Sequence, residues 1–382
     1  MKSSTTVFRV AIVAGTRPEV IKLAPVYHAF CTQTTPPKIE PLWIATGQHE
    51  DLQKSALKSF AITPTVHVHT MAQGTSLASL LARLLTAIDD TFAQLAPDFV
   101  LVQGDTMTTQ AAALAAFYRH IPYGHVEAGL RSGDFLAPFP EELNRRVVSL
   151  AATRHFAPTS FAKANLLKEG VSPSTILVTG NTAIDALFML KEKPSFPLPL
   201  AEALDRGMRL VLITAHRREN QGGGLAAICA AVNTLASRFP DVFFVLPIHA
   251  NPVVYEEIHR SFHPARNAML ILPLSYASLV TLMRRASLVL TDSGGLQEEA
   301  PALHVPVLIL RTVTERPEGV LAGCAKLVGT ETDRIVEEAT RLLTDPKAHA
   351  AMANIPCPFG DGAAAGRISE AVRAYLSTAK LQ

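Results

Sequence analysis

The chain has 382 residues, which is too long for one ordinary hydrophobic core and comfortable for two domains. Hydrophobic residues make up 48% of the sequence and charged residues 18%, so well-buried cores are expected. The formal net charge of +2 argues against an extended nucleic-acid-binding surface, and no apolar run reaches the roughly 18 residues of a membrane span, so we expect neither nucleic acid nor membrane as a partner.

The first predicted element is a buried strand at residues 8–14. This apolar stretch is short and runs directly into Thr16-Arg17-Pro18-Glu19, without the small-residue cleavage site of a signal peptide. The cysteines are scattered and form no C-x-x-C pair, which is typical of free thiols rather than of a disulfide framework or a zinc site (Cys31, Cys229, Cys324 and Cys357). Both observations predict a cytoplasmic protein.

Short apolar runs alternate with longer helical stretches along nearly the whole chain. The predicted strands of the first half are residues 8–14, 41–45, 99–102, 123–126, 155–157 and 176–179. Those of the second half are residues 210–214, 243–247, 269–272, 288–290 and 305–310. Alanine- and leucine-rich stretches between them, such as 77–95 and 108–118, predict helices. Because the strand runs are continuously apolar rather than alternating, they indicate parallel strands in βαβ units.

The two series of strands are separated by residues 191–208. This stretch contains Pro194, Pro197 and Pro199, and so many prolines favour an extended connector over a helix. We therefore place the domain boundary there. The sequence predicts an α/β fold of two Rossmann-like, doubly wound domains, 1–190 and 191–362, that face a central cleft where the carboxyl ends of the strands bind ligands.

Polar residues follow two strands of the first half. After residues 8–14, Gly15 permits a tight turn and Pro18 suits the first turn of a helix, which would place Arg17 and Lys22 beside exposed backbone N–H groups as an anion site. The alternative is a surface turn with a capping proline. After residues 99–102, Asp105 is a candidate acid, base or hydroxyl ligand, or a helix N-cap.

The densest set of charged residues spans residues 125–146. It carries Glu127 and Glu141 in a segment that glycines and prolines keep irregular. Carboxylates that are brought together raise one another's pKa, which is one way to make a general acid or base near neutrality. The alternative is a salt-bridged surface loop, in which Glu141 and Glu142 pair with Arg145 and Arg146 one turn later.

In the second half, His216 ends the first strand, and Arg217 or Arg218 beside it could meet a phosphate. Residues 222–227 superficially match G-x-G-x-x-A, but they start several residues beyond the strand, so we do not expect NAD binding there.

A strand, a small-residue turn and a helix follow one another near residue 291. Ser293, Gly294 and Gly295 would leave backbone N–H groups accessible to phosphate oxygens at the helix N-terminus. Glu299 could accept hydrogen bonds from ribose hydroxyls, and Arg316 could oppose a diphosphate charge. A merely structural turn needs no such set of carboxylate and arginine around it.

Several common motifs are absent, namely the P-loop, G-x-S-x-G and H-E-x-x-H. The remaining histidines of the second half form no convincing metal set (His249, His259 and His263).

The ordered motifs of the chain resemble those of the non-hydrolysing UDP-N-acetylglucosamine 2-epimerases. The resemblance runs from about Val10 to Gly362 and rests on GTRPEVIKLAPV, TGQH, QGDT, HVEAGLRSGD, PEELNR, GNTAIDAL, TAHRREN, IHANP, DSGGLQEEAPAL and TERPEGV. It implies a glycosyltransferase-B-like fold, usually as a homodimer. In that fold residues 1–190 would carry the catalytic carboxylates, residues 191–362 would bind UDP, and residues 363–382 would form a helix that packs back on the first domain.

The resemblance also implies roles for single residues. Carried over motif by motif, the catalytic residues are Arg17, Lys22, Asp105, Glu127, Glu141 and His216, and the UDP-binding residues are Arg17, Ser293, Gly294, Gly295, Glu299 and Arg316. The implied reaction converts UDP-N-acetylglucosamine to UDP-N-acetylmannosamine, for cell-surface polysaccharide precursors. It proceeds by anti elimination of UDP and re-addition, and it needs no cofactor and no metal. Which carboxylate is the base and which the acid stays open.

The sequence departs from the family pattern at two places. Leu279 stands where an aromatic residue usually packs against the uracil, and Ser275 stands where an aspartate usually precedes Tyr276. Asp51 and Gly74 stand where an amide and an arginine are expected in the members that bind a second substrate molecule as an activator, although Gln48, Arg217 or Arg218 and His249 remain.

Other functions compete with this interpretation. A sister epimerase would act on a modified sugar such as UDP-2,3-diacetamido-glucuronate, and a hydrolysing epimerase would release free N-acetylmannosamine. A UDP-sugar glycosyltransferase or an inactive UDP-sugar sensor would share the nucleotide pocket. Neither of the last two needs several acids around C2 of the sugar, so the carboxylates of the first half favour an epimerase.

Overall fold

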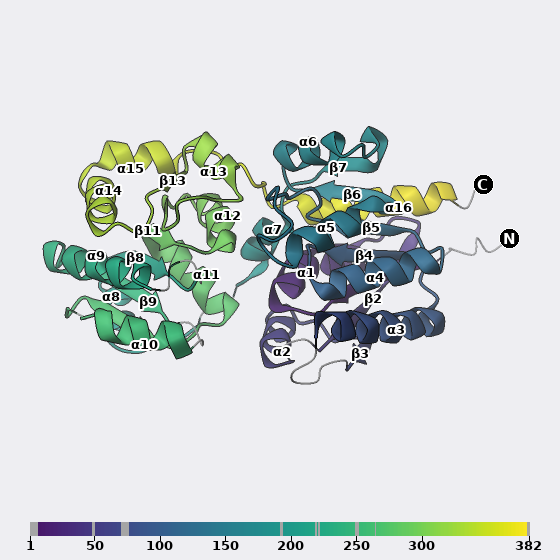
Figure 1. Ribbon diagram of the computed structural model, residues 1–382, viewed down its shortest axis with the longest axis horizontal. Helices are drawn as coiled ribbons and strands as arrows, with labels where there is room; N and C mark the ends of the chain where they lie inside the picture. Colours follow the sequence, from purple (N-terminus) through teal and green to yellow (C-terminus); the bar gives the residue numbers. More distant parts are fainter. Residues whose placement is uncertain are drawn as a thin grey trace. The chain divides into compact units, whose positions relative to one another are not determined.

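The computed structural model describes residues 7–47, 50–69, 76–191, 194–217, 220, 222–248, 252–263 and 265–379. The chain divides into two compact units. Unit 1 consists of residues 1–189 and 360–382, and unit 2 consists of residues 190–359. The chain therefore leaves unit 1, builds unit 2 and returns to unit 1 with its last helix (Figure 1).

Unit 1 is built on a parallel sheet of seven strands in the order β3-β2-β1-β4-β5-β6-β7. The strands are β1 (Val7–Ala14), β2 (Lys38–Thr46), β3 (Val66–Val68), β4 (Phe99–Gln103), β5 (Tyr123–Val126), β6 (Arg154–Ala157) and β7 (Ile176–Val178). Its helices are α1 (Arg17–Thr32), α2 (Glu50–Ser59), α3 (Leu77–Leu95), α4 (Met107–Tyr118), α5 (Glu141–Leu150), α6 (Ser160–Lys168), α7 (Thr182–Met189) and α16 (Ala364–Ala379), with a 3₁₀ turn at Pro173–Thr175.

The core of unit 1 shows why the strand runs are continuously apolar. All five residues of β4 are buried, because helices cover both faces of a parallel sheet. On one face the alanines of α4 pack between the sheet and α3, and Leu84, Ile88 and Phe92 of α3 complete the cluster. The small side chains of α4 let that helix lie close to the strands.

Helix α16 packs against α1 and α7 within unit 1. Asp185 of α7 accepts hydrogen bonds from the first backbone N–H groups of the returning segment, Ala364 at 3.3 Å and Ala365 at 2.8 Å. Arg367 donates to the carbonyl oxygen of Thr179 at 2.9 Å. A buried carboxylate at a helix N-terminus is favourable, so these contacts anchor α16 to the unit in which the chain begins.

Unit 2 is built on a parallel sheet of six strands in the order β10-β9-β8-β11-β12-β13. The strands are β8 (Arg209–Thr214), β9 (Val242–Pro247), β10 (Ala268–Ile271), β11 (Ala286–Thr291), β12 (Val307–Ile309) and β13 (Ala325–Leu327). The helices are α8 (Leu200–Asp205), α9 (Gly224–Arg238), α10 (Pro252–Ser261), α11 (Tyr276–Arg285), α12 (Gly294–Ala302), α13 (Pro317–Ala322), α14 (Thr332–Thr344) and α15 (Pro346–Ala353).

The strand orders confirm the predicted doubly wound architecture in both units. In unit 2 the order corresponds to 3-2-1-4-5-6 of a Rossmann fold, and unit 1 has the same order with one strand more. The order reverses between β1 and β4 in unit 1 and between β8 and β11 in unit 2. Ligands of such sheets bind at this switch point, beyond the carboxyl ends of the two strands.

All eleven predicted strands are present, and three elements differ from the prediction. Strands β3 and β13 were not expected, because each has only three residues and lies at a sheet edge. Residues 191–208 are not extended throughout, because α8 (Leu200–Asp205) lies among them. The prolines of this stretch precede the helix rather than interrupt it, and Pro199 is its N-cap residue.

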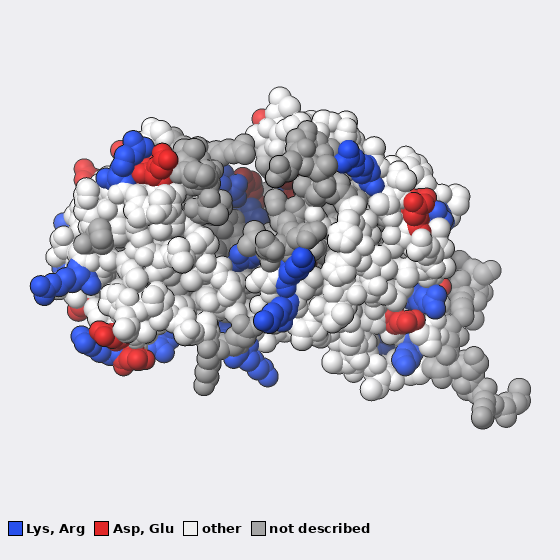
Figure 2. Space-filling model, turned by 90° about the horizontal axis from the view of Figure 1, so that it is seen from below, with Lys and Arg blue, Asp and Glu red and all other residues white. Residues whose placement is uncertain are grey.

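The surface shows scattered charges. Figure 2 shows Lys and Arg groups distributed over a mostly uncharged face, several of them next to Asp or Glu groups. Of the helices in the described residues, none combines the length and the hydropathy that a membrane span requires.

Candidate active site

The turn between β1 and α1 is held by the buried carboxylate of Glu19. One oxygen accepts hydrogen bonds from the backbone of Gly15 at 2.9 Å and Thr16 at 2.6 Å. The other oxygen accepts from the hydroxyls of Thr106 at 2.6 Å and Thr109 at 2.9 Å, which are the N-cap residue and a first-turn residue of α4, the helix that follows β4. Burial raises the pKa of Glu19, against the four hydrogen bonds that lower it. Glu19 therefore ties together the two turns at the switch point of unit 1.

Gly15 is required at this turn by close packing. A Cβ atom there would lie 2.3 Å from Oγ1 of Thr108 and 2.4 Å from Oγ1 of Thr46. The sequence predicted that a glycine is needed here for a tight turn. The structure gives a different reason, which is that α4 and β2 come too close to the backbone for a side chain. Arg17 is the first residue of α1, as predicted, and Lys22 lies one turn further along the helix.

Glu127 is the centre of a polar cluster in unit 1. Its carboxylate accepts from Nζ of Lys22 in an ion pair, from Nε2 of Gln103 and, at 3.3 Å, from Nδ2 of Asn181. These partners come from α1, β4 and the residue before α7. Glu127 follows β5 with a φ of +64°, a left-handed conformation that is strained for a residue other than glycine. Such strain persists where the surroundings hold it, often at functional sites.

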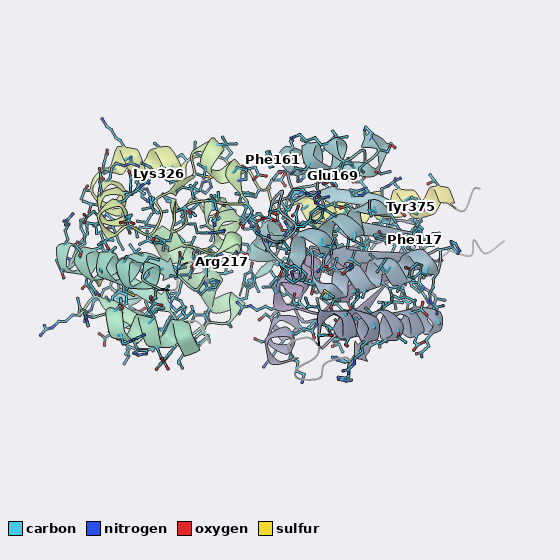
Figure 3. All side chains as sticks on the ribbon, viewed as in Figure 1. Phe117, Phe161, Glu169, Arg217, Lys326 and Tyr375 are labelled. Atoms are coloured by element: carbon cyan, nitrogen blue, oxygen red, sulfur yellow. The ribbon has the colours of Figure 1, made fainter. Side chains whose placement is uncertain are left out.

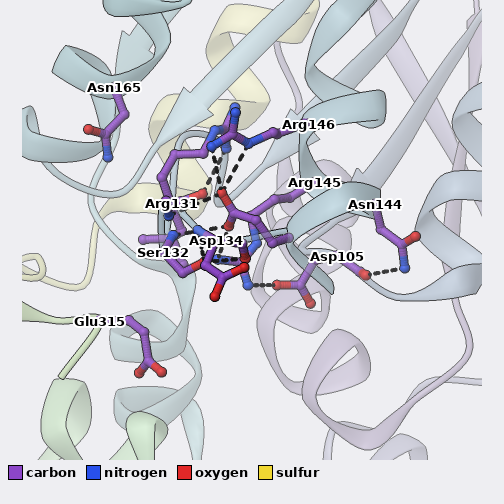
Figure 4. Close-up of polar contacts among 12 residues, drawn as sticks. Asp105, Arg131, Ser132, Asp134, Asn144, Arg145, Arg146, Asn165 and Glu315 are labelled. Atoms are coloured by element: carbon purple, nitrogen blue, oxygen red, sulfur yellow. Dashed lines mark hydrogen bonds and ion pairs between the residues drawn. The ribbon is translucent and has the colours of Figure 1, made fainter. Parts of the chain in front are cut away.

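A second cluster surrounds Asp105, which follows β4. Its carboxylate forms an ion pair with Arg145, and its backbone oxygen accepts from Nδ2 of Asn144 at 2.9 Å. Figure 4 shows Asp105 and Arg145 turned toward each other. Both partners belong to α5, so this helix fixes the position of the predicted catalytic aspartate.

Glu141 and Glu142 have different surroundings although they are neighbours in the sequence. Glu142 is fully buried and accepts from Arg145 at 3.3 Å and Arg146 at 3.0 Å. It also accepts from the backbone N–H groups of Ser132 at 3.0 Å and Gly133 at 3.4 Å, which holds the loop after β5. The salt-bridged alternative is therefore correct for Glu142. Glu141 makes neither pair, and its Oε2 is buried without a hydrogen-bond partner among the described residues.

His125 in the same motif is a structural residue. It is completely buried in β5, and Nε2 donates to the carbonyl oxygen of Gly104 at 2.8 Å. Burial lowers its pKa to about 3, against the Gly104 hydrogen bond that raises it. The neutral imidazole shapes the turn that carries Asp105.

In unit 2, His216 and Asp292 meet at the switch point. Asp292 follows β11 and is completely buried, and its Oδ1 lies 3.3 Å from Nδ1 of His216. Its Oδ2 accepts from the backbone N–H groups of His216 and Arg217, both at 2.8 Å, and from Nδ2 of Asn220 at 2.9 Å. A buried carboxylate thus organises the loop after β8.

The N-terminus of α12 is the predicted phosphate site. Ser293 is its N-cap residue, and Gly294 and Gly295 begin the helix, so their backbone N–H groups have no partner within the helix. Arg316 lies directly against Gly294, because a Cβ atom there would be 2.7 Å from Cζ of the guanidinium. Glu298 accepts from Nε of Arg316 at 2.7 Å and fixes its orientation. This places a cation beside a helix N-terminus, an arrangement suited to a diphosphate.

Two further contacts complete this part of unit 2. Glu299, the candidate ribose ligand, accepts from the hydroxyl of buried Tyr276 at 3.1 Å. Burial would raise the pKa of Glu315, but Arg311 and Arg316 overcome this effect and bring it to about 2. Glu315 therefore carries a negative charge between the two arginines.

Each predicted site residue lies in one of these two sets. Unit 1 carries Arg17, Lys22, Asp105, Glu127 and Glu141, and unit 2 carries His216, Ser293, Gly294, Gly295, Glu299 and Arg316. Sequence reasoning missed the side chains that orient them, namely Gln103, Arg145, Asn181, Tyr276 and Asp292. Four of them stand in motifs quoted above and Tyr276 follows Ser275, so proximity in the sequence was the available signal.

Two departures from the family pattern concern α11 and the expected activator site. Ser275 is the N-cap residue of α11 and accepts from the backbone of Ser278 at 3.1 Å, so it caps the helix in place of an aspartate. The side chains of the expected activator site, apart from Arg217, lie outside the described residues (Gln48, Asp51, Gly74, Arg218 and His249). In the described part of the chain, no three His, Cys, Asp or Glu side chains are grouped to hold a metal ion.

Comparisons with known proteins agree on one family. A family model described as UDP-N-acetylglucosamine 2-epimerase matches residues 33–373. The UDP-N-acetylglucosamine 2-epimerase of Escherichia coli K12 is 45% identical over 372 residues, which are 96% of this chain and 98% of that protein. The crystal structure of UDP-GlcNAc 2-epimerase from Neisseria meningitidis bound to UDP-GlcNAc has a TM-score of 0.86 and 42% identity, covering 96% of this chain and 99% of the other. A putative UDP-N-acetylglucosamine 2-epimerase from Listeria monocytogenes has a TM-score of 0.90 and 42% identity, covering 98% of both chains.

Proposed function

This chain belongs to the UDP-N-acetylglucosamine 2-epimerase family, which makes it a nucleotide-sugar epimerase, and we propose that it inverts C2 of the sugar by eliminating UDP and adding it back. The observation that carries the proposal is the set of three carboxylates, Asp105, Glu127 and Glu141, at the ends of β4 and β5 and the start of α5. The UDP-GlcNAc in the Neisseria meningitidis structure supports the same substrate here.

Unit 1 supplies the proton transfers. One carboxylate removes the proton from C2, the C–H electrons form a C1–C2 double bond, and the C1–O bond breaks with its electrons going to UDP. A second acid then returns a proton to C2 on the opposite face while UDP adds again at C1. Glu141 suits one of these roles, because no described residue engages its buried Oε2. Arg145 and Lys22 form ion pairs with Asp105 and Glu127 and so orient these two carboxylates.

Unit 2 supplies the UDP site. The backbone N–H groups of Gly294 and Gly295 and the guanidinium of Arg316 would bind the diphosphate, and Glu299 would accept from the ribose hydroxyls. His216 would add a donor to the diphosphate. These groups would stabilise the negative charge that UDP gains when the C1–O bond breaks.

A proton-exchange assay tests the proposal. Incubation with UDP-N-acetylglucosamine in heavy water should place deuterium at C2 and form the manno epimer. Exchange with a 2,3-diacetamido-glucuronate analogue but not with UDP-N-acetylglucosamine would identify the sister epimerase instead. Transfer of the sugar to an added acceptor, without exchange at C2, would identify a glycosyltransferase.

We further propose that the protein works in the cytoplasm as a homodimer. The four cysteines, which all lie among the described residues, form no disulfide with one another, and this suits a reducing compartment. Phe117, Tyr118 and Leu150 are exposed by 54%, 64% and 85% at the last turns of α4 and α5, two helices that pack together (Figure 3 labels Phe117). A second copy of the chain would cover these apolar side chains. Light scattering after size-exclusion chromatography should give twice the mass of the chain. The double variant Phe117→Ser/Tyr118→Ser should shift the measured mass toward that of the monomer. A monomeric wild type would refute the dimer.

A further inference from the structure

The turns after β8 and β11 are joined by backbone hydrogen bonding. Thr214 and Thr291 are partners in the parallel register of the two strands, and the N–H of Asp292 donates to the carbonyl oxygen of Thr214 at 3.1 Å. His216 and Asp292 are 76 positions apart in the sequence, but they emerge from adjacent strand ends. Their relative position is therefore set by the sheet itself.

The orientation of the Asp292 carboxylate is fixed by three donors. The N–H groups of His216 and Arg217 and the side-chain amide of Asn220 all converge on Oδ2 at 2.8 to 2.9 Å. Oδ1 accepts no hydrogen bond from a described residue and lies 3.3 Å from Nδ1 of His216, which is an ion-pair distance. A buried carboxylate oxygen at this distance attracts an N–H proton and repels a nitrogen lone pair, so the charge of Asp292 favours the proton on Nδ1 of His216.

We propose that Asp292 is a positioning residue of the epimerase, which keeps His216 protonated at Nδ1 and so makes Nε2 the nitrogen that meets UDP. The inference rests on the proposed function for the identity of that ligand. With Nδ1 held in this state, Nε2 is the atom that gains and loses the second proton. In the imidazolium form, Nε2–H donates to the diphosphate as the C1–O bond breaks, and Asp292 balances the positive charge.

The substitution Asp292→Asn separates this role from a structural one. Three N–H donors surround the position of Oδ2, so the amide oxygen of asparagine takes that place and its NH₂ group faces Nδ1 of His216. Nδ1 must then accept, and the imidazole proton moves to Nε2. His216 becomes a neutral donor that cannot take up a proton at Nε2, in the way that an Asp→Asn change selects the wrong tautomer in catalytic triads.

The decisive measurement is nitrogen-15 NMR of the histidines in the full-length protein without ligand, at a pH where the imidazole is neutral. The His216→Asn variant assigns the His216 signals among the 13 histidines. We expect the Nδ1–H tautomer in the wild type and the Nε2–H tautomer in Asp292→Asn. The kcat of Asp292→Asn should fall by roughly 10²- to 10⁴-fold, the range of a general acid, with a much smaller change in KM.

Two controls show whether Asp292 acts through His216. Asn220→Ala removes one donor to Oδ2 but leaves the pairing of Oδ1 with Nδ1, so His216 should keep the Nδ1–H tautomer. The double variant Asp292→Asn/His216→Asn should have the kcat of His216→Asn alone, because the aspartate has no further role once the imidazole is gone.

Two results would overturn the inference. The first is an Nε2–H tautomer in the wild type, and this result is decisive even if Asp292→Asn does not fold. The second is a folded Asp292→Asn variant whose kcat equals that of the wild type. The tautomer is measured without substrate. A protein with the Nδ1–H tautomer that does not convert UDP-N-acetylglucosamine would refute the proposed function and leave the positioning role standing.

Discussion

At the scale of single residues, neighbouring acids in one motif have separate tasks. Glu142 is buried and joins two arginines to the loop after β5, whereas Glu141 has a buried oxygen that no described residue engages. Their order in the sequence predicts that both begin a helix, but it does not say which of them pairs with the arginines. The difference follows from the direction in which each side chain leaves α5.

The matched variants Glu141→Gln and Glu142→Gln should therefore fail in different ways. Glu141→Gln should lower kcat by roughly 10²-fold or more with little change in stability, because it removes a group that we propose to exchange protons with the sugar. Glu142→Gln should lower the free energy of unfolding by about 3 kcal/mol, because it breaks buried ion pairs. Deuterium exchange at C2 and urea unfolding measure the two effects. Equal loss of stability in both variants would contradict the assignment.

At the scale of the elements, the strands were predictable and their connections less so. Continuous apolar runs identified eleven of the thirteen strands, because burial on both faces leaves a clear local pattern. The edge strands β3 and β13 and the short helix α8 lack a pattern of that length. The turn after β1 was expected from its residue types, but the reason for Gly15 lies in the packing of Thr46 and Thr108 around it.

Gly15→Ala should accordingly disturb how α4 and β2 approach the first turn. The added Cβ would lie within 2.4 Å of two buried threonine hydroxyls, which are hydrogen-bonded to each other at 2.9 Å. We expect a loss of about 1 to 3 kcal/mol in the free energy of unfolding. Gly366→Ala in α16 is the control, because apart from the neighbouring backbone of its own helix nothing lies within 4 Å of the added Cβ, and it should be neutral or stabilising. Urea titrations compare the two variants. If Gly15→Ala left the free energy of unfolding unchanged, the turn would be able to relax around the added Cβ.

At the scale of the whole molecule, the buried neutral histidine of β5 links global stability to pH. The pKa of His125 is about 3 in the folded protein and near 6.5 in an unfolded chain. Below pH 6.5 the unfolded state therefore binds a proton that the folded state does not. This contribution to stability is complete above pH 6.5 and is lost progressively as the pH falls toward 3.

The variant His125→Gln should reduce this dependence, because the glutamine amide can still donate to Gly104 but does not titrate. Between pH 7.5 and 5.5 the wild type should lose about 1 kcal/mol more of its unfolding free energy than the variant does. Urea unfolding at the two pH values measures the difference. Burial also lowers the pKa of His155. Its contribution to the pH dependence of stability is the same in both proteins, so it cancels in the difference between them. If both proteins lost the same unfolding free energy between the two pH values, His125 would not be the source of the pH dependence.

The sequence by itself determined the α/β class, most of the strands, the family and the candidate residues, because hydrophobic patterns and motifs are local properties of the chain. The tertiary structure alone decided which side chains orient those candidates. Arg145 reaches Asp105, Asn181 reaches Glu127, and Asp292 reaches His216 across gaps of 40, 54 and 76 residues. Those pairings follow from the parallel strand order and from helix packing, which bring distant turns together at the switch point of each sheet and which no local pattern of residues encodes.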